Sequence, residues 1–511
     1  MREIVCVPHS FDSRGCMTVI EPPRTQQGLV EPTPGRIEHA LPQSYPEPDM
    51  SSLSVSAVSE PAVSEPFDSV TRRLARAIAA AAPFDDAGAI AAARRGVLDF
   101  LAAAFAGASD NGYRKLLAVI TEGSRGDAAV IGHPGGVGAL DAALLNGYAG
   151  HALDYDDVHS SVRGHPSSVL LPALFALAQT QRSTALELLA AYVVGVETMA
   201  RLGLALGSRH YEQGFHNTAT LGTLGAAAAA SFLLRLDAAA IENALGLAAT
   251  QSAGLRLQFG SEAKPLHAGQ AARAGLLAAQ LAAQGLQGSP AALDGPTGFF
   301  AVFGAGAAQP QRVLEAWGAP WQIVAPGLYF KPWPCCTATH YALHAALTLR
   351  TAHRLTPDEI DRIVVTFPPG GDTPLASRLP ATGLEARFSV EYALAAALTD
   401  GAAGVATFAD VPVRAELAAL AARVTRRYDA SAPRASTDPA TRFSTVEITL
   451  RNGTSVSHKT DRLYSADDLH AKFSDAVGHD PALLELPAVV EAMLGADELA
   501  AIFPTFVKIK A

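Results

Sequence analysis

The stretch "STALELLAAYVVGVETMARLGLAL" (residues 183–206) decides how the first half of the chain folds. Its residues are apolar on nearly every side. Thr184 and Glu187 have the spacing of a capping box, in which each side chain accepts a hydrogen bond from the other residue's backbone, so a helix is predicted to begin there. A helix without a polar face must be enclosed by other helices. The stretch therefore predicts a buried helix within a tightly packed, multilayer helical domain.

Neighbouring segments predict the helices that enclose it. Apolar residues recur at spacings of three and four in "SVTRRLARAIAAAA" (69–82) and "AGAIAAARRGVLDFLAAAFAGA" (87–108). Asp237 is placed to cap a helix that begins "AAAIENALGLAA" (238–249). We assign residues 67–265 to an all-helical domain.

Strand patterns farther along indicate a second, smaller domain. The segment "DRIVVTF" (361–367) is typical of a strand, and "TVEITLRNGTSVSHKT" (445–460) alternates on both sides of Asn452-Gly453, a strong hairpin signal. Between them, "RFSVEYALAAALTDG" (387–401) is helical. We assign 266–465 to an α+β domain and expect the helical segment 466–511 to return to the first domain. The fold class is mainly α with a smaller α+β domain.

The first 66 residues differ in composition from the rest of the chain. They are rich in Pro, Ser and Glu without a sustained period, which is typical of a disordered tail. Met50 lies just before the composition changes and is an alternative start of translation to Met1. No secretory signal is predicted, so a cytoplasmic location is expected.

Charge and cysteine content exclude several classes of function. The chain has 511 residues and a formal net charge of −10 without a basic stripe, so nucleic acid is not an expected partner. The apolar run "TLGTLGAAAAASFLL" (220–234) is too short to predict a membrane span. The four cysteines lack a CxxC spacing, so neither structural zinc nor a disulfide framework is predicted, and Cys335 and Cys336 are expected to be reduced core thiols.

Titratable residues are concentrated in "HALDYDDVHSSVRGHPSS" (151–168). His151 and Asp154 share a helix face, while His165 lies in the loop before a helix that begins at Pro166. One interpretation is an acid/base pair of Asp154 and His165. Another is a capped, solvated helix end. A third is a metal site whose ligands are His151, Asp154, Asp156 and Asp157.

Three further segments carry candidate site residues. His216 precedes an apolar helix, whose N-terminus favours a neutral imidazole, although an ordinary core histidine is equally compatible. A connection between two apolar helices contains several glycines together with Arg256, Lys264 and His267. The cations there are expected to bind a substrate carboxylate or Glu262. Lys331 lies in "YFKPWPCCTATHYALHAAL" (329–347), in which His340 and His344 share a helix face but lack a third metal ligand.

These segments together resemble the MmgE/PrpD family. The resemblance is carried, in the family's order, by the stretches "NGYAGHALDYDDVHSSVRGHPSSVLLPALFALA", "GFHNTATLGTLGAAAAA", "GSEAKPLHAGQAARAG" and "KPWPCCTATH". It implies a homodimer with a helical domain, a smaller lid domain and a site between them that uses no metal or organic cofactor. The family's site residues fall on Asp154, His165, His216, Lys264 and His267. Val158 stands where cis-aconitate decarboxylases carry a polar Thr.

The resemblance implies carbanion-like chemistry next to a carboxylate, which needs a base, an acid and cations. The leading hypothesis is a cofactor-independent lyase for a small di- or tricarboxylate, with dehydration of the 2-methylcitrate type preferred. An epimerase and a cis-aconitate-type decarboxylase are alternatives, and a non-catalytic carboxylate-binding protein is an alternative of another class. His165 or His216 would move the proton, and Asp154 would orient an imidazole or act as the partner acid or base. The expected carboxylate-binding residues are Lys264, Arg256, His267 and Lys331.

Overall fold

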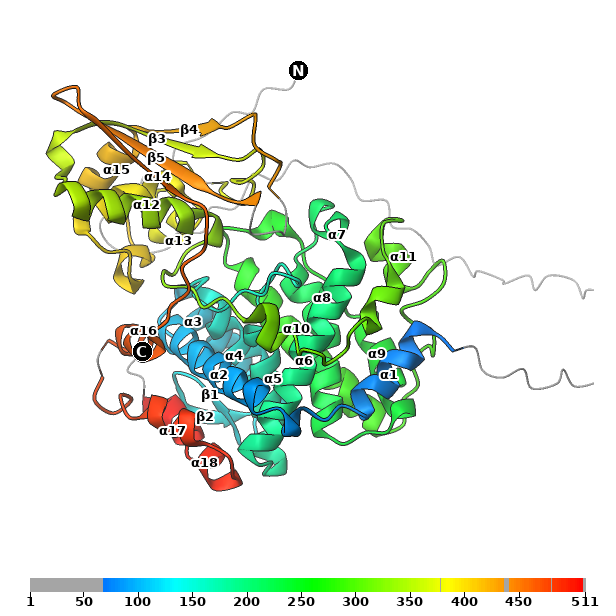
Figure 1. Cartoon of the computed structure of the whole chain (residues 1–511). Coiled ribbons are helices and arrows are strands. Elements are labelled where there is room, and N and C mark those ends of the chain that lie inside the picture. Colours follow the sequence, from blue (N-terminus) through cyan, green and yellow to red (C-terminus); the bar gives the residue numbers. More distant parts are fainter. Residues whose placement is uncertain (1–67, 377, 436–440, 479, 509–511) are drawn as a thin grey trace, which may run out of the picture. The chain divides into compact units, whose positions relative to one another are not determined.

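The computed structural model describes residues 68–508, except 377, 436–440 and 479. The predicted tail at 1–66 lies outside the described residues. The part from Pro66 onward is mainly helical, and its larger core is built from helices with one short hairpin (Figure 1). The helices are α1 (Val70–Ala79), α2 (Ala87–Gly107), α3 (Asn111–Gly123), α4 (Ala139–Ala152), α5 (Ser167–Gln181), α6 (Ala185–Leu206), α7 (Arg209–Glu212), α8 (Asn217–Leu233), α9 (Ala238–Ala249), α10 (Ala263–Ala283) and α11 (Phe299–Gly304), and the hairpin is β1 (Ala128–Val130) with β2 (His133–Val137).

Helix α6 runs through the middle of this core. Its predicted capping box is confirmed, since the Thr184 N–H donates to Glu187 Oε2 at 2.8 Å and the Glu187 N–H donates to Thr184 Oγ1 at 3.2 Å. Among the described helices, α6 alone is long and apolar enough to cross a membrane, but 94% of the relevant window is buried inside the protein. Packing against α2, α5 and α8 therefore accounts for its apolar composition.

Helices α4 and α10 pack unusually closely, and this contact positions the candidate site. A Cβ on Gly269 would lie 2.2 Å from the Leu144 backbone oxygen, and a Cβ on Gly147 would lie 2.7 Å from the Gly269 Cα. Only glycine permits such an approach of two backbones. The contact brings the end of α4 at Ala152 beside the beginning of α10 at Ala263.

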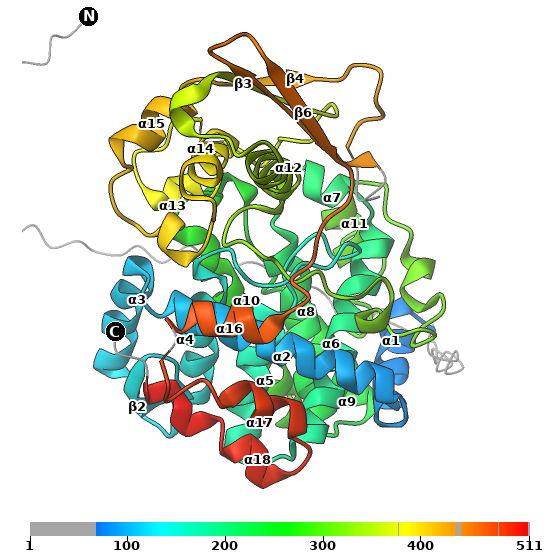
Figure 2. The same cartoon turned by 60° about the vertical axis from the view of Figure 1, so that its left-hand side comes forward.

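The smaller core begins at Cys335 and combines a four-stranded sheet with helices (Figure 2). The strand order is β4-β3-β5-β6, with β3 parallel to β4 and antiparallel to β5. The predicted strand and the predicted hairpin at Asn452-Gly453 are confirmed, and Gly453 has the positive φ of +88° that this turn requires. The elements are α12 (Thr337–His353), β3 (Ile360–Phe367), α13 (Gly383–Ala386), α14 (Val390–Asp400), α15 (Ala415–Ala421), β4 (Val424–Tyr428), β5 (Ser444–Leu450) and β6 (Ser455–Thr460).

The boundary between the two cores differs from the sequence-based boundary at residue 266. The larger hydrophobic core extends to Phe330, and the smaller one begins at Cys335. Helix α10 belongs to the larger core because it packs against α4 and α8. The Gly-rich connection before α10 thus joins two helices of one domain rather than two domains.

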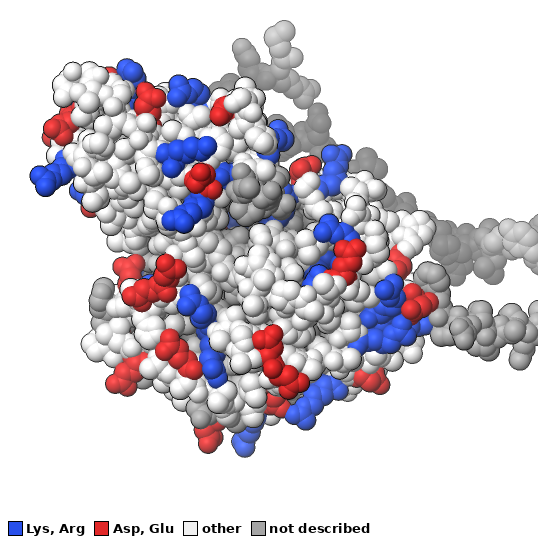
Figure 3. All heavy atoms as spheres, viewed as in Figure 1, with Lys and Arg blue, Asp and Glu red and all other residues white. Residues whose placement is uncertain are grey.

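The C-terminal helices lie against the larger core (Figures 1 and 2). They are α16 (Leu469–Ala476), α17 (Leu486–Ala492) and α18 (Ala496–Ala500). Helix α16 packs on α2, where the rings of Phe473 and Phe105 meet edge to face with centroids 5.8 Å apart. On the face in Figure 3, acidic and basic side chains are interspersed, and this face shows no field of one sign.

The close contact of α4 with α10 leads to a stability prediction. Gly269→Ala should lower the free energy of unfolding by about 1–3 kcal/mol, because the added methyl group has no space against a backbone carbonyl. Urea unfolding followed by circular dichroism measures the change. The control is Gly123→Ala at the end of α3, where a Cβ meets nothing within 4 Å. Equal stability of the two variants would contradict the packing described.

Candidate active site

The acidic segment begins with a tight turn directly after α4. Because α4 ends at Ala152, Asp154 lies beyond the helix, and the expectation that it shares a helix face with His151 is wrong. Asp154 has a positive φ of +53°, a left-handed conformation that Asp tolerates better than most residues. Buried cations from three distant segments donate to backbone oxygens of this turn: Arg387 to Ala152 at 2.5 Å, Lys331 to Asp154 at 2.7 Å and Lys472 to Tyr155 at 2.8 Å. Carbonyls at a helix C-terminus carry partial negative charge, so the three cations stabilise the turn.

The carboxylate of Asp154 is held between two ammonium groups. Its Oδ1 lies 2.8 Å from Lys264 Nζ and 3.1 Å from Lys331 Nζ, and all three side chains are buried. Lys264 is also 2.8 Å from His151 Nε2. Because an ammonium group can only donate, His151 Nε2 must accept, and its Nδ1–H then donates to Asp156 Oδ2 at 2.8 Å. His151 is therefore the neutral tautomer that is protonated at Nδ1.

The charges of this cluster follow from burial and from the neighbouring groups. Burial, with Lys264 and His165 adding to it, lowers the pKa of His151 to about 3, although Asp156 opposes the shift. Burial alone would raise the pKa of Asp154, but Lys264 and Lys331 hold it below its ordinary value. The pKa of Asp156 is well below its usual range because His151 and His165 outweigh burial. Both carboxylates are therefore ionised at neutral pH, and His151 is uncharged.

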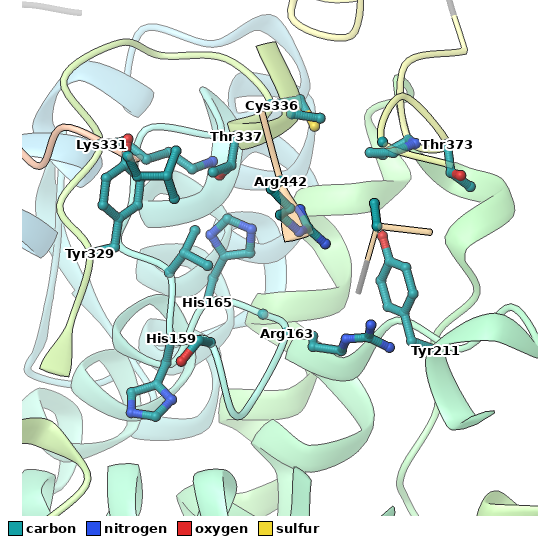
Figure 4. A pocket seen from close by; sticks show the side chains of 18 of the residues that line it. His159, Arg163, His165, Tyr211, Tyr329, Lys331, Cys336, Thr337, Thr373 and Arg442 are labelled. Carbon is teal, nitrogen blue, oxygen red and sulfur yellow. The ribbon is translucent and has the colours of Figure 1, made fainter. Parts of the chain in front are cut away.

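Two further histidines lie beside this cluster. His165 Nε2 is 3.6 Å from Asp154 Oδ1, and His165 Nδ1 is 3.3 Å from Asp156 Oδ1. Figure 4 shows the His165 ring pointing into a cavity. His216 is the residue directly before α8, and burial together with Lys264 places its pKa well below the ordinary value, so it is neutral, in agreement with the sequence-based expectation. Its Nδ1 lies 3.1 Å from His267 Nδ1.

The cavity has a volume of about 970 Å³ and contains most of the residues that the sequence pointed to. His267 lies behind His216 and does not line it. Arg256 lies on Tyr211, with its guanidinium carbon 4.0 Å from the ring centroid. The predicted residues that line the cavity are Asp154, His165, His216, Arg256, Lys264 and Lys331.

Two local expectations for Lys264 and His267 are wrong. Both residues lie in the first turns of α10 rather than in a loop, because Pro265 is compatible with the start of a helix. The alternative in which Lys264 pairs with Glu262 at the surface is also wrong. Glu262 pairs with Lys115 at 2.7 Å, and the Lys264 side chain is only 5% exposed.

The proposed metal ligands separate into two groups. Asp157 instead hydrogen-bonds the hydroxyl and backbone N–H of Ser167, so its inclusion in a metal site is wrong. The set with ligand atoms within 4.8 Å of one another consists of His151, Asp154, Asp156 and His165. Lys264 Nζ lies at hydrogen-bond distance from two of these ligands, so an ammonium group already supplies the positive charge that a metal would bring.

The His340–His344 pair has other partners. His340 donates from Nε2 to the Cys335 carbonyl at 3.1 Å and accepts at Nδ1 from the Tyr329 hydroxyl at 2.8 Å. His344 stacks on Tyr464 with ring centroids 3.7 Å apart. These partners support the interpretation of an ordinary helix face.

Sequence reasoning missed two of the cations that hold the turn. Lys472 of α16 pairs with Asp99 of α2 at 2.6 Å, and burial raises the pKa of Asp99 and lowers that of Lys472. Arg387 comes from the smaller domain and also contacts Asp110 at 3.8 Å. No local pattern indicates either role, although Arg387 is the first residue of the segment "RFSVEYALAAALTDG" (387–401), which the sequence predicts to be helical.

Sequence comparisons identify the family of the chain. Residues 72–311 match the sequence model of the MmgE/PrpD N-terminal domain, and residues 333–488 match that of the C-terminal domain. The chain belongs to the MmgE/PrpD family. It is similar to the cis-aconitate decarboxylase of Mus musculus, with 33% identity over 353 residues that cover 65% of this chain and 70% of the relative. A cis-aconitate decarboxylase of Aspergillus terreus is 29% identical over 336 residues, which cover 61% of this chain and 68% of that protein.

The position of Lys264 leads to a prediction about metals. Purified protein should hold substoichiometric metal by mass spectrometry, and neither EDTA nor one equivalent of Zn²⁺ should shift its Tm. Lys264→Ala removes the ammonium group and leaves the four possible ligands, so Zn²⁺ should raise the Tm of that variant alone. A wild-type protein that contains one metal per chain and loses stability in EDTA would contradict this account.

Buried neutral histidines lead to a prediction about pH. As the pH falls below 6.5, each should lower the free energy of unfolding by up to about 1.4 kcal/mol per pH unit. The reason is that the histidine takes up a proton in the unfolded chain but not in the folded protein. Three buried aspartates whose pKa burial raises, Asp99, Asp110 and Asp157, act in the opposite sense but are fewer than the five histidines. The histidines are His151, His159, His210, His216 and His340. The urea midpoint should fall between pH 7 and pH 5; a constant or rising midpoint would be inconsistent with neutral histidines.

Proposed function

We propose that the chain is a lyase that acts on a small polycarboxylate with its own side chains. The observation that carries the proposal is the Asp154 carboxylate held between Lys264 and Lys331, with His165 beside it at the cavity wall. Asp154 fixes both ammonium groups in place before a substrate arrives. Such fixed cations stabilise negative charge that develops next to a carboxylate.

Each lysine retains binding capacity for substrate. Lys264 Nζ donates to His151 and Asp154, and Lys331 Nζ donates to the backbone oxygen of Asp154 and contacts its carboxylate. An ammonium group has three N–H donors, so one donor on each lysine is left for an acceptor in the cavity. Two donors from different directions can hold a carboxylate and stabilise the enolate form that the reaction creates on it.

Proton transfer is assigned to the histidines at the cavity. His165 lies beside the carboxylates of Asp154 and Asp156 and lines the cavity, which makes it the candidate proton donor. His216 is buried and neutral, which makes it the candidate acceptor. Nearby His267 can exchange a proton with His216, since their Nδ1 atoms are 3.1 Å apart. Asp154 and neutral His151 act by orienting Lys264.

We place decarboxylation first among the possible reactions, since the similar proteins of Mus musculus and Homo sapiens are cis-aconitate decarboxylases. In this reaction the C–C bond to one carboxylate breaks and CO₂ leaves. The electron pair remains on the substrate next to a carboxylate held by the lysines, and a proton from His165 quenches it. The branched apolar Val158 at the cavity favours a substrate that differs from cis-aconitate.

Dehydration of the 2-methylcitrate type is the second candidate. It is favoured by the presence of two separate proton-exchanging groups, since a base must remove the C–H proton and an acid must protonate the departing hydroxyl group. Epimerisation uses the same two groups without a leaving group. A non-catalytic binder needs the lysines but has no use for the two histidines.

The biological unit is part of the proposal. The family resemblance implies a homodimer in which the smaller domain closes over the cavity, and a cytoplasmic location remains part of the proposal. Light scattering on the purified protein measures the oligomeric state, and a monomer would remove this part of the proposal without affecting the chemistry.

The test is a turnover screen followed by one matched pair of variants. Cis-aconitate, citrate, 2-methylcitrate and iminodisuccinate are incubated in D₂O and followed by NMR, with released CO₂ measured in parallel. CO₂ release indicates decarboxylation, a new double bond without CO₂ indicates dehydration, and deuterium uptake alone indicates epimerisation. If none of the four acids gives CO₂, a new double bond or deuterium uptake, the result would favour the non-catalytic binding protein.

Lys264→Ala should lower kcat/KM roughly ten- to a hundredfold. This is the effect of losing a hydrogen bond to a charged group, which contributes about 1.5–3 kcal/mol. Lys115→Ala, which removes an exposed lysine that pairs with Glu262, is the control and should retain full activity. A Lys264→Ala enzyme with kcat/KM within twofold of the wild type would refute the assignment of the lysines.

A further inference from the structure

A second group of cations lies in the cavity, away from the lysines. The guanidinium carbons of Arg163 and Arg256 lie 5.3 Å and 4.0 Å from the ring centroid of Tyr211. Each arginine also donates to a backbone oxygen, Arg163 to Ser208 at 3.3 Å and Arg256 to Tyr211 at 2.6 Å. Figure 4 shows the Arg163 guanidinium beside the Tyr211 ring, away from Lys331. These contacts fix both arginines at the cavity wall.

Neither guanidinium forms an ion pair with a carboxylate of the described residues. Lys264 and Lys331, in contrast, share the carboxylate of Asp154. Burial, Arg442 and, to a smaller extent, Arg256 lower the pKa of Arg163, while Tyr211 and Glu212 oppose the shift, so positive charges are crowded here despite one nearby acid. An anion bound between the arginines would relieve this crowding.

The described cavity lining has a strong excess of positive charge. It contains seven Lys or Arg residues and three Asp or Glu residues, a difference of +4, whereas the whole chain has a formal net charge of −10. The cations are Arg163, Arg256, Lys264, Lys331, Arg434, Arg442 and Arg462, and the acids are Asp154, Glu212 and Asp461. Such an excess in a concave site favours ligands with several negative charges.

The arginines are close enough to the candidate catalytic groups for one ligand to reach both. Arg163 lies two residues before His165. The backbone N–H of Arg256 donates to the backbone oxygen of Gly214 at 2.8 Å. Gly214 lies two residues before His216, so the Arg256 backbone is close to His216. Two residues of chain span at most about 7 Å between Cα atoms. The cavity wall also includes the apolar side chains of Val158, Phe259, Leu328 and Phe388.

We propose that Arg163 and Arg256, held on Tyr211, form a second carboxylate subsite, and that the substrate is an elongated polycarboxylate. One of its carboxylates lies at Lys264 and Lys331, another lies between the arginines, and an apolar stretch between them contacts the Val158 side of the cavity. The identification of the bound molecule as a substrate rests on the proposed function, whereas binding at the arginines does not require turnover. Arginine suits this task because its planar fork matches both oxygens of a carboxylate.

Calorimetry with unreactive dicarboxylates of equal charge tests the subsite. Succinate and suberate both carry two carboxylates but differ in the length of the apolar chain between them, so suberate is the probe for a ligand that reaches both the lysines and the arginines. Wild-type protein should bind suberate at least tenfold more tightly than succinate at the same ionic strength. Arg163→Met and Arg256→Met should each weaken suberate binding at least tenfold and change succinate binding less than threefold. Arg209→Met, which removes an exposed arginine outside the cavity lining, is the control and should leave both affinities unchanged.

The outcomes separate the subsite from the proposed reaction. Equal affinities for the two diacids in the wild type, or equal losses for both in the Met variants, would overturn the subsite. Arg163→Lys and Arg256→Lys keep the positive charge and serve as controls in case the Met variants misfold. If these Lys variants bind suberate as tightly as the wild type does, the planar guanidinium fork has no role in binding. Stronger competition against suberate by inorganic phosphate than by acetate would overturn the assignment to a carboxylate. Failure of every acid in the turnover screen would leave these binding results intact and would count only against the lyase.

Discussion

The site depends on one carboxylate, that of Asp154, which is shared by the ammonium groups of Lys264 and Lys331. Burying any of these charges alone would be strongly unfavourable, and together they compensate one another. Asp154 follows the end of α4, Lys264 opens α10, and Lys331 lies where the chain passes from the larger core to the smaller. The ion cluster therefore fixes three parts of the fold as well as the polarity of the cavity. Gly147 and Gly269 make it possible, because they let α4 and α10 approach closely enough for Lys264 to reach the turn.

Much of the fold follows from local sequence rules. The capping box at Thr184, the cap at Asp237 and the hairpin at Asn452-Gly453 are short-range features, and the structure contains each of them. The domain boundary does not follow from such rules. The connection before α10 contains several glycines, as many interdomain linkers do, but packing of α10 on α4 and α8 places it within the larger core. Glycine content predicts where the chain forms a loop, but it does not predict which helices pack against each other on either side of that loop.

The candidate site was accessible from sequence in part. Asp154, His165, His216, Lys264 and Lys331 lie in conspicuous motifs, and the structure brings all five to one cavity. The partners that hold them were not accessible, since Lys472 pairs across 317 residues with the Tyr155 backbone and belongs to a surface-like helix pattern. The tautomer of His151 was equally hidden, because it follows from a lysine far away in the sequence that can only donate.

The contact of Lys472 also bears on the order in which the molecule is assembled during synthesis. The turn at Asp154 is translated early, while the lysine that donates to the next backbone oxygen is translated 317 residues later than Tyr155. Until that lysine emerges from the ribosome, Asp99 lacks its ion-pair partner and the turn lacks one of its three cations. The nascent helical domain thus cannot complete its site by itself. A chain interrupted before α16 would carry every cavity residue and still leave the turn without Lys472, so completion of the C-terminal segment serves as the last step in forming the site.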